Sequence, residues 1–144
     1  VVLAHGILPD QKKCEQSFTE TKKVFEINCL SIVTYLTILG EYFKKQHAGN
    51  IVVISSVAGD RIRKSNYIYG TSKGALSLFC DGLRSRLMEN NINILNLDMS
   101  TDKASNNTKV KILTEILDLD KLSWLTEQLQ NFTELKQVDY TINS

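Results

Sequence analysis

The 144-residue chain lacks several features that would mark it as a particular class of protein. Its formal net charge is only +1, so no overall field favours nucleic acid or a membrane surface. No uninterrupted apolar run approaches the roughly 20 residues of a membrane span, and the first residues do not resemble a signal peptide. Cys14, Cys29 and Cys80 form no C-x-x-C pair, which argues against a zinc site or a disulfide framework. We therefore expect a cytoplasmic protein with structural cysteines, no metal and no nucleic-acid partner.

Glycine and proline are also scarce, and their placement divides the chain. The single proline is Pro9, and no glycine follows Gly82. Lysine and arginine outnumber the acidic residues before residue 98, whereas the opposite holds after it. This change predicts two segments: an α/β segment over residues 1–97, and an atypical, helical tail over 98–144 in which Trp124 and Phe132 are packing anchors.

Hydrophobic patterning over residues 1–97 alternates between strand and helix. Apolar runs at 1–4, 51–54 and 92–97 are typical of parallel strands, and the first has the composition of a strand buried on both faces. Apolar residues at three- and four-residue spacing predict one helix from near Ser17 or Thr19 to about Gln46, ended by Gly49-Asn50, and another over about 67–89. The predicted stripes are Val24, Ile27, Leu30, Ser31, Thr34, Ile38 and Leu39 in the first helix, and Ala75, Leu76, Phe79, Leu83, Leu87 and Met88 in the second. This alternation is typical of a parallel α/β sheet.

One set of residues has the spacing expected of catalytic groups. Tyr69 and Lys73 lie four residues apart on the second predicted helix and therefore share one face. A nearby ammonium favours phenolate and lowers the pKa of a tyrosine, which suits the phenol to acid–base catalysis near neutral pH. Ser56, at the end of the preceding strand, is placed to donate a hydrogen bond to a carbonyl oxygen. A Y-x-x-x-K pattern alone is a weak signal, but its register after a β-branched strand ending in S-S-V-A-G is much stronger.

The residues alone allow two interpretations for each of two features. Asn28, inside the first helix, is either a solvent-facing residue or a buried one that needs a hydrogen-bond partner. The charged stretch 60–66 is a surface loop, in which Arg61, Arg63 and Lys64 are either solvated or grip an anionic substrate.

These residues resemble the short-chain dehydrogenase/reductase family over roughly residues 1–97. The matching parts, in the family's order and spacing, are Ala4-His5-Gly6, Asn28, Ile54-Ser55-Ser56-Val57-Ala58-Gly59 and Tyr69-Gly70-Thr71-Ser72-Lys73. More narrowly, Ser56 to Arg61 and Ala4 to Asp10 resemble the branch that contains decaprenylphosphoryl 2-keto-pentose reductases. That branch acts in cell-wall arabinan precursor synthesis, and related bacterial reductases act in surface-polysaccharide pathways. The resemblance implies part of a Rossmann-like parallel sheet, namely the family's strands 4–6 with their helices.

The resemblance also implies a role for each matching residue. Tyr69 would be the general acid in ketone reduction, and Lys73 would lower its pKa and hold the nicotinamide ribose. Ser56 would orient the substrate carbonyl, and Asn28 would hold a water that links Lys73 to solvent. NADP or NAD would be the cofactor and carry the hydride. The residues in contact with it would be Ala4, His5, Gly6, Ser55, Tyr69 and Lys73.

The resemblance extends to substrate and partners. The substrate would be a keto-sugar or a polyprenyl-phosphate-linked sugar, and a partner in cell-envelope biosynthesis is implied. The helices that carry Asn28 and Tyr69 would pair with a second copy of the chain in a four-helix interface.

The sequence departs from the family pattern in two places. It contains no glycine-rich phosphate loop, and the residue that selects NAD or NADP is missing with that loop. Asp98-Met99-Ser100 stands where the family has Pro-Gly, and Ser100 to Ala104 is similar to a five-residue motif of nucleotide-sugar 4,6-dehydratases. We therefore expect the 144-residue chain alone to bind nicotinamide cofactor weakly or not at all. The alternatives are an inactive remnant that persists through dimerisation, and a flavodoxin-like binding domain whose catalytic register is coincidental.

Overall fold

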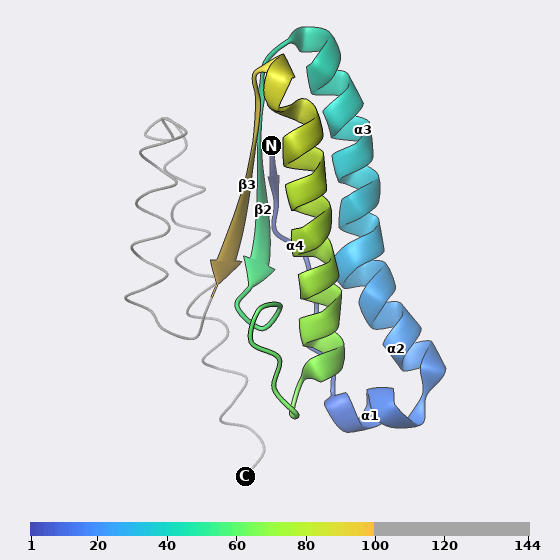
Figure 1. Ribbon diagram of the computed structural model, residues 1–144. Coiled ribbons are helices and arrows are strands. Elements are labelled where there is room, and N and C mark those ends of the chain that lie inside the picture. The colour runs from blue at the N-terminus through green and yellow to red at the C-terminus, as the bar shows by residue number, and fades with distance from the viewer. Residues whose placement is uncertain (100–144) are drawn as a thin grey trace, which may run out of the picture. The chain divides into compact units, whose positions relative to one another are not determined.

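Three parallel strands form the sheet in the computed structural model, which describes residues 1–99 (Figure 1). Strands β1 (Val2–Leu3), β2 (Gly49–Ser56) and β3 (Ile92–Met99) lie in the order β1-β2-β3. Their register places Val2 opposite Val52 and Ile51 opposite Ile94. The predicted parallel α/β sheet is confirmed. The predicted tail, with Trp124 and Phe132, lies outside the described residues.

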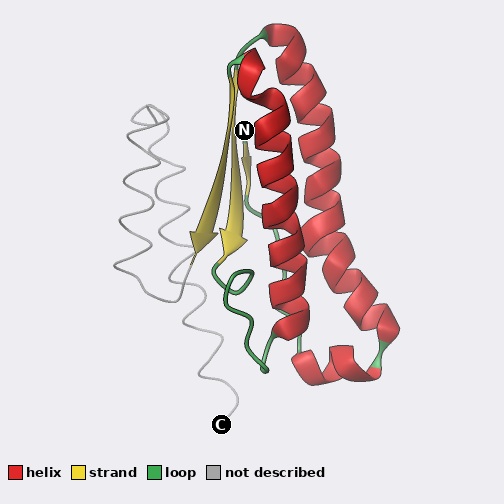
Figure 2. Cartoon of the chain, in the orientation of Figure 1, coloured by secondary structure: helices red, strands yellow, loops and turns green. Residues whose placement is uncertain are grey.

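Helices connect the strands, and α3 and α4 lie side by side against one face of the sheet (Figure 2). The helical elements are α1 (Gln11–Gln16), α2 (Phe18–Phe25), the π turn η1 (Glu26–Leu30), α3 (Ser31–Gln46), α4 (Tyr67–Leu87) and the 3-10 turn η2 (Met88–Asn90). The first predicted helix is confirmed as α2, η1 and α3 in continuous succession. The helical stretch Phe18–Gln46 is long and apolar enough to cross a membrane. Core helices of soluble proteins have the same length and composition, so this is weak evidence for a membrane span. The second predicted helix corresponds to α4 and η2, which Asn91 ends in the left-handed conformation (φ 56°).

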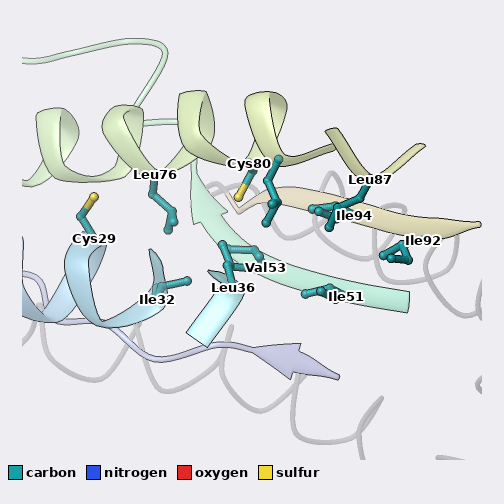
Figure 3. Packing of buried hydrophobic residues seen from close by; sticks show 11 residues of the cluster. Cys29, Ile32, Leu36, Ile51, Val53, Leu76, Cys80, Leu87, Ile92 and Ile94 are labelled. Carbon is teal, nitrogen blue, oxygen red and sulfur yellow. The ribbon is translucent and has the colours of Figure 1, made fainter. Parts of the chain in front are cut away.

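The main core lies between the sheet and the two long helices (Figure 3). Its residues are Cys29, Ile32, Leu36, Ile51, Val53, Leu76, Cys80, Leu83, Leu87, Ile92 and Ile94. Each fully buried aliphatic side chain contributes roughly 1.5–3 kcal/mol, so this cluster fixes α4 on the sheet. Along β2 every residue from Ile51 to Ser56 is buried.

The π turn changes which residues of the long N-terminal helix are buried. A π turn holds more residues than an α-helical turn, so the buried face beyond it shifts toward the C-terminus. The buried positions include Ile32 and Leu36. The predicted burial was therefore wrong for Leu30, Thr34 and Ile38, which are exposed.

Two short elements also differ from the prediction. β1 is two residues long and half-buried rather than enclosed on both faces, because within the described residues its one hydrogen-bonded neighbour is β2. No helix was predicted between residues 4 and 17, where α1 forms. The Asp10 carboxylate caps this helix, since it accepts the Lys12 N–H at 2.9 Å and the Lys13 N–H at 3.2 Å.

Details of both long helices need correction as well. The first helix ends at Gln46 as predicted, but His47 supplies the left-handed residue (φ 54°). Gly49 instead opens β2, where a Cβ would lie 2.4 Å from the Phe43 ring. Ala75 on α4 and Met88 in η2 were predicted to be buried and are exposed.

Candidate active site

The sequence-predicted residues gather at the carboxyl ends of the parallel strands. Gly6 follows β1, Ser56 ends β2, and the first two turns of α4 carry Tyr69 and Lys73. In Figure 1 these strand ends lie at the same end of the molecule as the start of α4. In open parallel sheets this end is where ligands bind.

Asn28 is completely buried, so its interpretation as a surface residue was wrong. Its Oδ1 accepts the Ile7 N–H at 2.7 Å, and its Nδ2 donates to the Ile7 carbonyl at 2.8 Å. Nδ2 also approaches the Ser72 hydroxyl at 3.4 Å. The Ile7 N–H can only donate and its carbonyl can only accept, so these bonds fix which way the amide points. Asn28 therefore ties the segment after β1 to the π turn and to α4.

Lys73 is also buried, with only 4% of its surface exposed. Its Nζ donates to the Ile54 carbonyl of β2 at 3.3 Å. A Cβ on Gly6 would lie 3.2 Å from both this Nζ and Asn28 Oδ1. Gly6 therefore keeps open the space beside an ammonium and an amide oxygen. Burial of an ammonium is costly unless other groups compensate for it, and this arrangement marks Lys73 as a functional candidate.

Tyr69 is buried one turn before Lys73 on α4, and Ser72 connects it to Asn28. The Ser72 hydroxyl donates to the Tyr69 carbonyl at 2.7 Å, so it can only accept from Asn28. Sequence reasoning did not single out Ser72. Its position immediately before Lys73 in the Tyr69–Lys73 motif was the available signal.

Ser56 is held by a turn that packs closely on α4. Its hydroxyl accepts the Ala58 N–H at 3.3 Å, which leaves the hydroxyl proton for another acceptor. A Cβ on Gly70 would lie 2.6 Å from the Ala58 carbonyl, and one on Gly59 would lie 2.8 Å from the Gly74 nitrogen. The absence of side chains at these glycines allows the turn after Ser56 to approach the helix that carries Tyr69 and Lys73.

Ser55 lies on the α4 side of the sheet in a separate polar network. Ser77 donates to the Lys73 carbonyl at 3.2 Å, and it lies 3.3 Å from the Ser55 hydroxyl. Asn96 Nδ2 donates to Ser77 at 2.9 Å. This network joins β2, β3 and α4 behind Lys73. The predicted contact between Ser55 and cofactor stays a prediction.

The start of α4 receives a cap from α1. The residue before α4, Asn66, makes no side-chain capping bond. Instead Gln11 Oε1 accepts the Ile68 N–H at 3.2 Å. Helix N-termini leave such N–H groups unpaired, so α1 stabilises the turn that carries Tyr69. Gln11 was not identified from the sequence, because its partner is distant along the chain.

Two groups of basic side chains lie near this arrangement. Arg61, Arg63 and Lys64 are exposed in the loop between β2 and α4, which confirms the predicted surface loop. His5 is also exposed, and its Nε2 lies 2.8 Å from the Ser31 hydroxyl. Burial and the neighbouring Lys73 charge lower the pKa of His5, so the neutral imidazole is favoured.

The cysteines are free and buried, and within residues 1–99 no group of three His, Cys, Asp or Glu side chains could hold a metal ion. Burial raises the pKa of Cys80 to about 11, so this thiol is protonated at neutral pH. Burial also raises the pKa of Cys14 and of Cys29. These thiols pack as small apolar groups.

Comparisons with known proteins agree with this architecture. The family described as short chain dehydrogenase matches residues 1–111. An uncharacterized oxidoreductase of Mycobacterium tuberculosis is 36% identical over 94 residues, which are 65% of this chain and 38% of that protein. An uncharacterized oxidoreductase of Streptomyces coelicolor is 33% identical over 95 residues, 66% of this chain and 38% of that protein. A short-chain dehydrogenase structure from Streptomyces avermitilis superposes with a TM-score of 0.56 at 21% identity, over 67% of this chain and 34% of that one.

The fold is therefore that of a Rossmann-like α/β sheet, and the chain belongs to the short-chain dehydrogenase family. Members of this family are generally NAD(P)-dependent oxidoreductases. The chain spans about 38% of the length of the curated relatives named above. These comparisons support the family and do not single out the 2-keto-pentose reductase branch.

Proposed function

We propose that the protein containing this chain is an NAD(P)(H)-dependent oxidoreductase that reduces a ketone, with Tyr69 as its general acid. The observation that carries this proposal is the buried Lys73 ammonium, which lies beside Asn28 and Gly6 one turn after Tyr69. An ammonium in this place favours the phenolate form of a nearby tyrosine.

In this proposal the chain's own residues would contact the nicotinamide half of the dinucleotide. Bound NADPH or NADH would supply the hydride. The Tyr69 hydroxyl would transfer its proton to the carbonyl oxygen as this oxygen gains negative charge, and the Lys73 charge would stabilise the phenolate left behind. The Ser56 hydroxyl, whose proton is not used within the turn, would donate to the same oxygen. Lys73 would also hold the nicotinamide ribose.

Other residues would complete the cofactor contacts and the proton path. Asn28 Oδ1 accepts one N–H and retains a second lone pair, to which a water linking Lys73 to solvent would donate. Contacts from Ala4, His5, Gly6 and Ser55 to the cofactor belong to this proposal. No glycine-rich phosphate loop occurs in the 144 residues, so pyrophosphate binding lies outside what they provide.

We further propose that the substrate is a keto-sugar, free or linked to a polyprenyl phosphate, in cytoplasmic cell-envelope biosynthesis. The support is the loop between Ser56 and Tyr69, where Arg61, Arg63 and Lys64 are exposed at the end of the sheet that carries the candidate site. Arginine and lysine bind phosphate by charge-assisted hydrogen bonds. A phosphate-bearing substrate suits these residues better than a neutral one.

A second copy of the chain is the proposed partner. The face of α3 that was predicted to be buried carries exposed apolar side chains, and Leu78 of α4 is 74% exposed. Leu30 in η1 and Ile38 in α3 come from the predicted stripe, and Tyr35 and Tyr42 of α3 are exposed as well. Light scattering should show a dimer that Ile38→Lys dissociates. A monomeric wild-type protein would contradict this part of the proposal.

Turnover tests the proposed function. The natural polypeptide that carries these 144 residues is supplied with NADPH or NADH and a panel of keto-sugars, and nucleotide oxidation is followed at 340 nm. Tyr69→Phe should abolish reduction while cofactor binding persists, whereas the control Tyr67→Phe, on an exposed side chain of the same helix, should retain it. Full activity of Tyr69→Phe would disprove the assignment of the acid. No oxidation with any ketone would favour the inactive remnant.

A further inference from the structure

We propose that His5 is a positioning residue: through Ser31 it clamps the segment after β1 to the π turn, and thereby holds Asn28 in place beside Lys73. This inference deepens the proposed function, since Asn28 and Lys73 belong to the proposed site. Its test needs no turnover, so the two can fail separately.

The π turn creates the need for the clamp. In an α-helix the Ser31 N–H would bond to the Ile27 carbonyl four residues earlier. Here it bonds instead to the Glu26 carbonyl, one residue further back. The Ile27 carbonyl thereby loses its α-helical partner, and the Ser31 hydroxyl donates to it at 2.7 Å.

This bond fixes the direction of the next one. A serine hydroxyl has one proton, and the Ile27 carbonyl cannot donate, so the proton of Ser31 is committed to that carbonyl. The contact of 2.8 Å between Ser31 Oγ and His5 Nε2 therefore has the imidazole as its donor. Neutral His5 carries its proton on Nε2, and protonation at Nδ1 would leave this bond intact.

The clamp acts on both ends of the Asn28 contact. His5 lies two residues before Ile7, whose N–H donates to Asn28 Oδ1 and whose carbonyl accepts from Asn28 Nδ2. Ser31 lies three residues after Asn28 and ends the same π turn. A ring contact with Tyr35, edge-on with centroids 6.0 Å apart, further restrains the imidazole. The two segments that Asn28 joins are therefore held a second time by His5 and Ser31.

Amide exchange in the isotopically labelled 144-residue chain tests the clamp. Ser31→Ala and His5→Phe should each speed exchange of the Ile7 N–H by about fivefold, as expected for loss of one supporting hydrogen bond. His5→Gln, whose amide keeps a donor near the Nε2 position, should restore most of the protection. The double variant should exchange no faster than either single one, because both remove the same bond.

Thr34→Ala is the matched control. Thr34 makes the same kind of bond to the carbonyl four residues earlier, at 2.9 Å to Leu30, and is exposed. Its loss should leave Ile7 exchange unchanged. Equal effects of Thr34→Ala and Ser31→Ala, or additive effects in the double variant, would overturn the proposal.

The direction of the bond has its own readout. Nitrogen-15 spectra of the His5 ring should show the proton on Nε2 in the neutral form, and the Ile7 N–H should stay protected after His5 is protonated. Lys73 is the charged group that acts on His5. Loss of protection on His5 protonation would show that Nε2 accepts rather than donates. If Ser31→Ala does not fold, this measurement on the wild-type chain decides.

Discussion

The close packing of α4 on the turn after Ser56 makes a quantitative prediction for one methyl group. In Gly70→Ala the new Cβ would lie 2.6 Å from the Ala58 carbonyl oxygen. That oxygen belongs to the backbone, so no side-chain rotation relieves the contact and the turn or the helix must move. Overpacking of this kind costs about 1–3 kcal/mol. Replacing a helical glycine by alanine returns about 1 kcal/mol, so we expect a net loss of up to about 2 kcal/mol.

Gly82→Ala is the matched control on the same helix. A Cβ there meets nothing within 4 Å, so the helix preference acts alone and should raise the free energy of unfolding by about 0.5–1 kcal/mol. Urea unfolding followed by circular dichroism would compare the two variants with the wild-type chain. Because both variants gain the helix preference, the gap between their unfolding free energies should equal the overpacking cost, about 1–3 kcal/mol. A Gly70→Ala chain as stable as Gly82→Ala would refute the close approach that holds Ser56 near α4.

Three further predictions concern the groups around the site. Asn28→Ala leaves the Ile7 N–H and carbonyl without their partner and should lower the free energy of unfolding by about 2–4 kcal/mol. The control Asn93→Ala, on the surface, should lower it by less than about 0.5 kcal/mol. Equal losses would contradict the role of the buried amide. Burial raises the pKa of Cys80 to about 11, so at pH 8 it should react with iodoacetamide more than about a hundredfold slower in the folded chain than in urea. Peptide mass spectrometry measures both rates. Similar rates in the folded chain and in urea would contradict the burial of this thiol. Because the pKa of His5 is lowered in the folded chain, the unfolded chain binds the proton more readily, and stability should fall as the pH drops below about 6.5. Unfolding at pH 7.5 and 5.5 should show a smaller fall for His5→Gln, and an identical fall would mean that His5 makes no contribution.

Much of the fold could be predicted because its signals repeat along the chain. The β-branched run at 51–54 is typical of a buried strand. The long stretches with apolar residues at three- and four-residue spacing are typical of amphipathic helices. The π turn carries no such signal, because it adds a residue without any mark in composition, and so the predicted face of α3 was wrong. Helix α1 was missed because its six residues are too few for a periodic pattern to appear.

The candidate site was also predictable in part. Tyr69 and Lys73 share a face because of their spacing, and this was predictable from sequence alone. Asn28 was ambiguous, because its partner Ile7 lies in a loop 21 residues away and a polar residue in a helix is usually solvated. Ser31 was taken for a member of an apolar stripe, and its role depends on a carbonyl that only the π turn releases.

The central claim is that Tyr69 gives its proton to a ketone oxygen while the adjacent carbon receives a hydride. NADPH deuterated at its transferable position, supplied with a keto-sugar that the natural polypeptide consumes, tests this claim directly. Mass spectrometry of the product should find one deuterium on the new alcohol carbon with the wild-type protein and with Tyr67→Phe, and no product with Tyr69→Phe. Deuterated product from Tyr69→Phe at the wild-type rate, or consumption of the ketone without deuterium transfer, would contradict the account.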